Sequence, residues 1–234
     1  MQLMEIMMET KELLIAFFSK SLEAEINEKM LYYAYSFEYE KVNEYIKGLI
    51  DIPLEDFISF VLENYKVPYL EASDVLQYSS FDDCTVNICK VFKEAGDKGF
   101  TALEAGKLLE NDGIERKDGA YLKYGENHSK AAVQLGLLNC LSNKFFLSCL
   151  GYVINDIDIT EQRKIITRLI LRNKLVQRLL YKAIKNGHSD YNYETGFLSS
   201  STSLRRKSNV RKVIEYLCST DEIDLSGLLS EIVF

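Results

Sequence analysis

The sequence predicts a mainly α-helical protein, and three observations support that class. Apolar residues recur at spacings of three and four along most of the chain, and the alternation typical of strands is scarce. Only 2 Pro and 12 Gly interrupt the 234 residues. A chain of this length can bury a substantial core, in one large domain or in two small ones.

The charge is distributed very unevenly along the chain. The formal net charge is −7, yet residues 1–80 hold 15 acidic and 6 basic side chains, a net charge of −9. Residues 163–214 hold 13 basic and 2 acidic side chains, a net charge of +11. A binding partner responds to the local field, so the late basic region is compatible with a polyanionic partner. We therefore expect an acidic helical domain at 1–80, a middle unit at 81–151 and a basic helical bundle at 152–234.

The acidic region predicts three helices. The first covers residues 3–20, and the second begins at Leu22 with an apolar seam that continues to Phe37 and beyond. The third begins near Pro53, because proline suits a first helical turn, and ends at Pro68. These apolar faces indicate an ordinary helical core, with a seam that joins two copies into a homodimer as the alternative.

The middle unit predicts three helices followed by a β-hairpin. Asp82 is expected to cap the first helix, and Thr101 caps the second in a T-x-x-E capping box. The third helix covers 126–135 and ends at Gly136. Strands at 137–141 and 144–147 then form a hairpin. This order is typical of a winged helix-turn-helix, in which the hairpin is the wing that touches phosphates.

The third of these helices has one polar side, which we expect to face a duplex. At 100° per residue, Ser129, Lys130 and Val133 point away from the apolar face, with Gln134 on the flank. Lysine suits guanine and glutamine suits adenine, although ordinary surface positions are the alternative. His128 falls beside the apolar face, which indicates a packed, hydrogen-bonded histidine rather than one that contacts a base or takes part in catalysis.

The carboxy-terminal bundle predicts helices over 159–172, 175–184 and 203–217. The last of them combines a buried apolar face with the basic cluster Arg205, Arg206, Lys207, Arg211 and Lys212. Hydroxyl groups at 199–203 precede this cluster, and helix-start amides beside them are suited to phosphate. Phosphates bound by Lys and Arg release counterions, so the cluster indicates DNA. A solvated basic face that balances the acidic region is the alternative.

Three segments carry a resemblance to a known family. They are YGENHSKAAVQLGLL at 124–138, RLILRNKLVQRLL at 168–180 and STSLRRKSNVRKVIEYL at 201–217. Together they resemble the helical DNA-binding module of bacterial type II restriction endonucleases and related restriction-modification proteins, over about 84–217. The resemblance implies recognition of duplex DNA beside a separate nuclease domain, and residues 1–80 do not resemble a nuclease.

These arguments define a set of expected DNA contacts. The set is Lys123, Asn127, Ser129, Lys130, Gln134, Asn143, Lys144, Ser203, Arg205, Arg206, Lys207, Arg211 and Lys212.

The predicted function is the binding of double-stranded DNA as a recognition or accessory subunit of a bacterial restriction or defence system. A nuclease or methyltransferase subunit is the expected protein partner. One alternative is a dimeric winged-helix transcriptional regulator with a palindromic target. Another is a protein-interaction adaptor whose basic face docks onto an acidic partner.

No catalysis, metal or cofactor is expected, with a Mg²⁺-dependent DNA endonuclease as the alternative. Glu9-Thr10-Lys11 matches the E-x-K motif of such nucleases, but no pair of strands precedes it. Asp156 and Asp158 are typical of a loop at the start of a helix rather than of a metal site. Five cysteines without a C-x-x-C pair and two histidines do not indicate a zinc site. An acidic amino terminus and the lack of a long apolar run predict a soluble cytoplasmic protein.

Overall fold

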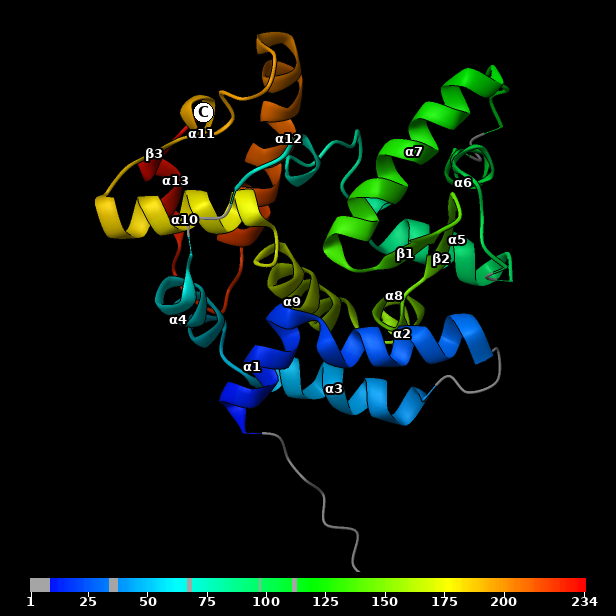
Figure 1. Cartoon of the computed structure of the whole chain (residues 1–234), viewed down its shortest axis with the longest axis horizontal. Coiled ribbons are helices and arrows are strands. Elements are labelled where there is room, and N and C mark those ends of the chain that lie inside the picture. The colour runs from blue at the N-terminus through cyan, green and yellow to red at the C-terminus, as the bar shows by residue number, and fades with distance from the viewer. Residues whose placement is uncertain (1–8, 34–37, 67–68, 97, 111–112) are drawn as a thin grey trace, which may run out of the picture.

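A computed structural model of the chain describes residues 9–33, 38–66, 69–96, 98–110 and 113–234. Within these ranges the protein is mainly α, as the periodicity predicted, with thirteen α-helices and two small two-stranded sheets. Helices α1 to α3 form one layer, from which the middle unit and the carboxy-terminal helices extend side by side (Figure 1). None of the helices in the described ranges is long and apolar enough to cross a membrane.

The four amino-terminal helices are short and have apolar inner faces. Phe17 of α1 and Phe57 of α4 are fully buried and meet edge to face, with ring centroids 5.2 Å apart. Pro53 is the residue before α4 and not part of its first turn, which corrects the predicted start by one position. The predicted seam residue Phe37 lies outside the described residues. The bounds are α1 Thr10–Ser19, α2 Ser21–Tyr33, α3 Tyr39–Asp51 and α4 Leu54–Asn64.

The middle unit has the predicted order of three helices and an antiparallel hairpin. Thr101 caps α6 through the predicted capping box with Glu104, and Gly136 ends α7 in the left-handed conformation at φ 81°. Asp82 begins a 3-10 turn at Asp82–Cys84 and does not cap α5. The bounds are α5 Val86–Glu94, α6 Ala102–Leu109, α7 Asp118–Leu135, β1 Leu138–Leu141, β2 Lys144–Leu147 and α8 Cys149–Val153.

The carboxy-terminal helices end in a parallel pair of two-residue strands, where Ser189 lies opposite Ile232. Asp158 caps α9, because its carboxylate accepts hydrogen bonds from the Thr160 and Glu161 amides. The bounds are α9 Ile159–Ile170, α10 Lys174–Asn186, β3 Ser189–Asp190, α11 Tyr191–Glu194, α12 Ser200–Cys218, α13 Ser226–Glu231 and β4 Ile232–Val233.

One continuous apolar core joins the three segments that the sequence suggested as domains. Helix α8 packs on α2 and α3, and α9 packs on α3 and α12. A buried polar cluster reinforces this junction: Arg172 binds the Glu23 carboxylate through both terminal nitrogens, and the Tyr45 hydroxyl donates to the same carboxylate at 2.8 Å. Burial raises the pKa of Tyr45, so the phenol stays protonated and can donate.

Candidate nucleic-acid interface

Helix α7 presents a polar stripe to solvent. Lys123, Asn127, Lys130 and Gln134 follow one another at spacings of four, three and four, so they lie on one side of the helix. Lys123 and Lys130 are exposed, and Asn127 and Gln134 are half-buried. The helix begins at Asp118, eight residues before the predicted start at Glu126, and this longer helix includes Lys123 in the stripe.

Two glycines hold α7 against α6. A side chain at Gly125 would overlap the Ala102 carbonyl oxygen, and one at Gly106 would overlap the Tyr121 carbonyl oxygen. The two backbones therefore touch, which only glycine permits at these positions. This contact fixes the direction in which the polar stripe points.

A connector, residues 72–83, lies between α7 and α12 and binds both helices. On the α7 side, the Gln134 amide donates to the Ser73 carbonyl oxygen, and the Tyr124 hydroxyl donates to Asp83 at 2.5 Å. On the α12 side, Asn209 donates to the Tyr78 carbonyl oxygen at 2.8 Å. The connector therefore sets the position of the stripe relative to α12.

His128 is the buried link between α7 and the connector. Its Nε2 accepts hydrogen bonds from the Ser79 and Ser80 amides at 3.3 and 3.2 Å, so Nδ1 carries the proton and donates to the Tyr124 carbonyl oxygen at 2.8 Å. Burial lowers the pKa of His128, which keeps the ring neutral near pH 7. The prediction of a packed, hydrogen-bonded histidine is confirmed.

The β1–β2 hairpin flanks the other side of the stripe. Ser142 and Asn143 both have positive φ, at 50° and 62°, which is the conformation of a two-residue type I′ turn. Phe145 exchanges backbone hydrogen bonds of 2.9 and 2.8 Å with Phe100, so the strand segment before α6 supports the hairpin. Asn143 and Lys144 are exposed at the tip, as predicted.

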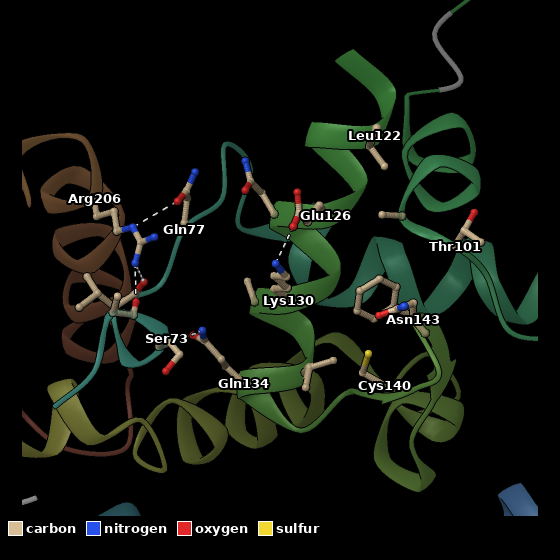
Figure 2. A pocket seen from close by; sticks show the side chains of 17 residues that line it. Ser73, Gln77, Thr101, Leu122, Glu126, Lys130, Gln134, Cys140, Asn143 and Arg206 are labelled. Carbon is tan, nitrogen blue, oxygen red and sulfur yellow. Dashed lines mark hydrogen bonds and ion pairs between the residues drawn. The ribbon is translucent and has the colours of Figure 1, made fainter. Parts of the chain in front are cut away.

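Three residues of the stripe, Asn127, Lys130 and Gln134, lie on the floor of a hollow of about 1020 Å³, which we call the α7 hollow (Figure 2). The hairpin and the start of α6 line one side of the α7 hollow, and the connector with Arg206 lines the other. Five of the predicted contact residues line it together, namely Asn127, Lys130, Gln134, Asn143 and Arg206. Arg206 is held there by hydrogen bonds to the Gln77 side chain at 3.2 Å and the Val75 carbonyl oxygen at 3.1 Å.

Two predicted contact residues face the interior. Ser129 is fully buried, because the side of α7 that carries it packs inside the middle unit. Ser203 is 9% exposed, and its hydroxyl pairs with that of Thr195 at 2.8 Å. The prediction that these two serines are exposed to a duplex is therefore wrong.

The other cations of α12 do not line the α7 hollow. Arg205, Arg211 and Lys212 are exposed and Lys207 is half-buried. Arg211 forms an ion pair with Glu215 at 2.9 Å. The predicted basic cluster therefore divides, and Arg206 alone of its five members lines the α7 hollow.

Several cations of the late basic region are committed to internal acids. Arg168 and Arg172 are buried and bind Glu222 and Glu23. Arg178 and Lys182 both bind the buried carboxylate of Glu194. The surface charge of this region is therefore smaller than its sequence suggests.

Sequence reasoning missed Glu126, which lies on the floor of the α7 hollow and pairs with Lys130. The spacing of four residues between an acid and a base on one helix is the signal that identifies such a pair. Leu122, 48% exposed, lines the α7 hollow as well and was also missed.

The acids considered for a nuclease have structural partners. Asp156 binds Lys93 at 2.7 Å and Asp158 caps α9. Glu9 and Lys11 lie at the exposed start of α1. Within the described part of the chain, no three His, Cys, Asp or Glu side chains are placed to hold a metal ion together.

No protein-family model, curated protein or solved structure matches this chain.

Proposed function

We propose that the protein binds double-stranded DNA through the α7 hollow, with α7 in the major groove and the β1–β2 hairpin against the adjacent backbone. The observation that carries this proposal is the polar stripe of Lys123, Asn127, Lys130 and Gln134 beside the exposed hairpin tip. A helix with its side chains is about 10–12 Å across, and the major groove is about 12 Å wide. The arrangement of α5, α6, α7 and the hairpin supports a winged helix in which α7 contacts bases.

The charge of this surface supports a duplex as its partner. Lys123, Lys130, Lys144 and Arg206 lie on or beside the α7 hollow, where Glu126 is an acid of the floor. Lys144 at the hairpin tip is placed for a phosphate, and the Asn127 amide on α7 is placed for a base edge. The Gln134 amide is bound to the Ser73 carbonyl oxygen.

The test is duplex affinity, measured by fluorescence anisotropy at low salt, for wild type and two triple variants. The interface variant carries Lys123→Ala, Lys130→Ala and Lys144→Ala. The control carries Lys47→Ala, Lys66→Ala and Lys185→Ala, which remove the same charge from exposed positions on α3, after α4 and on α10. We expect the interface variant to lose at least tenfold in affinity and the control to lose much less, whereas equal losses would contradict the proposed surface.

The narrower role is that of a recognition or accessory subunit in a restriction or defence system, working with a nuclease or methyltransferase subunit. The three segments that resemble restriction-modification proteins support this role, and they include most of α7 and α12. We expect the pure protein with Mg²⁺ to leave supercoiled plasmid intact. If nicked or linear plasmid forms with the protein and does not form in the same buffer without it, the protein has nuclease activity of its own.

A protein-interaction adaptor is the competing function. It is favoured by the exposed basic residues Arg205 and Lys212 of α12, which lie outside the α7 hollow and form a basic face that an acidic protein could bind. If wild-type protein shows no duplex binding even at low salt, the adaptor replaces the DNA-binding proposal.

A further inference from the structure

Glu126 is an acid in a surface that we have proposed to face DNA. Its carboxylate lies 2.5 Å from the Lys130 ammonium, and the two side chains are 46% and 63% exposed. Figure 2 shows the pair on the face of α7 that lines the α7 hollow. A carboxylate at this position opposes the approach of phosphates and of the acceptor-rich major groove, so it weakens binding unless a base donates to it.

The other polar groups of the stripe are engaged differently. The Gln134 amide is bound to the Ser73 carbonyl oxygen, whereas the Asn127 side chain makes no hydrogen bond to any described residue. Among the residues that the structure describes, Glu126 and Lys130 bind only each other, and exposed ion pairs of this kind contribute little free energy and exchange readily with other partners. Both ends of this pair are therefore available to a ligand that offers a donor and an acceptor close together.

A cytosine and a guanine present that combination in the major groove. Cytosine N4 donates a hydrogen bond and suits a carboxylate, and guanine O6 and N7 accept from a lysine. Given duplex binding through the α7 hollow, we propose that Glu126 and Lys130 together select a C·G pair or two adjacent C·G pairs. Glu126 accepts from cytosine N4, and Lys130 leaves Glu126 to donate to guanine.

The same pair disfavours other sequences. Thymine presents the acceptor O4 where cytosine presents its amine, and it adds a methyl group at C5. Adenine offers an amine at N6, but the adenine N7 acceptor lies beside that amine and opposes a carboxylate, and thymine O4 gives Lys130 one acceptor where guanine gives two. At an A·T pair, the Glu126 carboxylate must therefore either keep Lys130 away from the DNA or accept from adenine N6 beside the repelling N7 acceptor. Glu126 thus lowers affinity for random duplex while it raises discrimination.

The experiment is selection of duplexes from a randomised library, followed by affinity measurement on the selected site and on that site with its C·G pair changed to T·A. Wild type, Glu126→Ala and Glu126→Gln are compared with Glu44→Ala, which removes the same charge from an exposed position on α3. We expect wild type and Glu44→Ala to select a C·G position and to lose about tenfold on its change to T·A. Glu126→Ala and Glu126→Gln should lose the preference and bind random duplex several-fold more tightly.

The outcomes distinguish a failure of the base selection by Glu126 and Lys130 from a failure of the DNA-binding function on which it rests. If wild type binds duplex DNA but shows no C·G preference, or if wild type and Glu126→Ala select the same site, the role assigned to Glu126 and Lys130 is wrong. The DNA-binding function itself then still stands. An absence of duplex binding by every protein, wild type included, overturns the DNA-binding function and the pair with it.

Discussion

Neighbouring residues on α7 have opposite surroundings. Ser129 is fully buried, and its hydroxyl has no hydrogen-bond partner among the described residues. Lys130, the next residue, is exposed on the floor of the α7 hollow. Substitutions of Ser129 and of Lys130 can therefore distinguish an effect on stability from an effect on binding within one helix.

We expect Ser129→Ala to raise the free energy of unfolding by about 1 kcal/mol, because it removes a buried polar group without a partner. It should leave duplex affinity unchanged. Lys130→Ala should leave the midpoint of urea unfolding nearly unchanged and weaken duplex binding. A loss of duplex affinity in Ser129→Ala at unchanged stability would show that Ser129 reaches the DNA.

The neutral state of His128 makes stability depend on pH. Its pKa in the folded protein lies below the usual value of about 6.5, so the unfolded chain binds the proton more tightly. Its contribution is therefore complete above about pH 6.5 and is lost as the pH falls towards the lowered pKa. Urea unfolding from pH 7.5 down to pH 5 should show this loss in wild type.

The two histidines provide a matched comparison. His128→Gln should be less stable than wild type at pH 7.5, and the difference should shrink as the pH falls. His188→Gln, at an exposed position on the loop after α10, should follow wild type throughout. A constant difference between His128→Gln and wild type across this range would contradict the assigned neutral state.

At the scale of elements, the contact between α6 and α7 depends on glycine. Gly125→Ala places a methyl group against the Ala102 carbonyl oxygen, so α7 must shift, at a cost of about 1–3 kcal/mol or more. Gly119 lies on the same helix with nothing within 4 Å of an added side chain, so Gly119→Ala should stabilise by about 0.5–1 kcal/mol. Urea midpoints check both, and equal effects of the two alanines would contradict this contact.

Elements that follow local rules could be predicted from the sequence. The capping box at Thr101, the end of α7 at Gly136 and the hairpin at 138–147 depend on a few neighbouring residues. The start of α7 could not, because Gly119 and Gly125 lower helix propensity and their purpose is visible only with α6 in place. The burial of Ser129 could not be predicted either, because it depends on packing against elements distant in the sequence.

The α7 hollow could be predicted only in part. Lys123, Asn127, Lys130 and Gln134 share a face by helical periodicity, which requires no tertiary information. The position of Arg206 depends on the connector, whose hydrogen bonds to α7 and α12 no local pattern indicates. Arg172 and Glu23 are 149 residues apart in the sequence, so their pairing could not be inferred from charge counts.

At the scale of the whole molecule, the Arg172–Glu23 pair connects the amino-terminal layer to the turn between α9 and α10. Arg172→Met leaves the Glu23 carboxylate buried without its cation, at a cost of about 3–5 kcal/mol. Arg172→Met with Glu23→Gln removes the uncompensated charge and should recover much of that loss. Urea unfolding of both variants checks this, and an equal loss in the single and double variants would contradict the role of the buried charge.

The continuous core has a related consequence for unfolding. Because α8 and α9 pack on the amino-terminal helices, we expect those helices and the α7 hollow to unfold together. Far-ultraviolet circular dichroism and tyrosine fluorescence should give coincident urea transitions. Two separated transitions would instead support an independent domain at 1–80.

The salt dependence of duplex affinity tests the proposed interface most directly, because its slope reports the number of phosphate contacts. Wild-type affinity should fall steeply between about 50 and 200 mM salt. Lys144→Ala, at the hairpin tip, should reduce the slope by about one, whereas Lys185→Ala should leave it unchanged. A wild-type affinity that is independent of salt, or equal slopes for wild type and Lys144→Ala, would contradict a duplex bound at the α7 hollow and its hairpin.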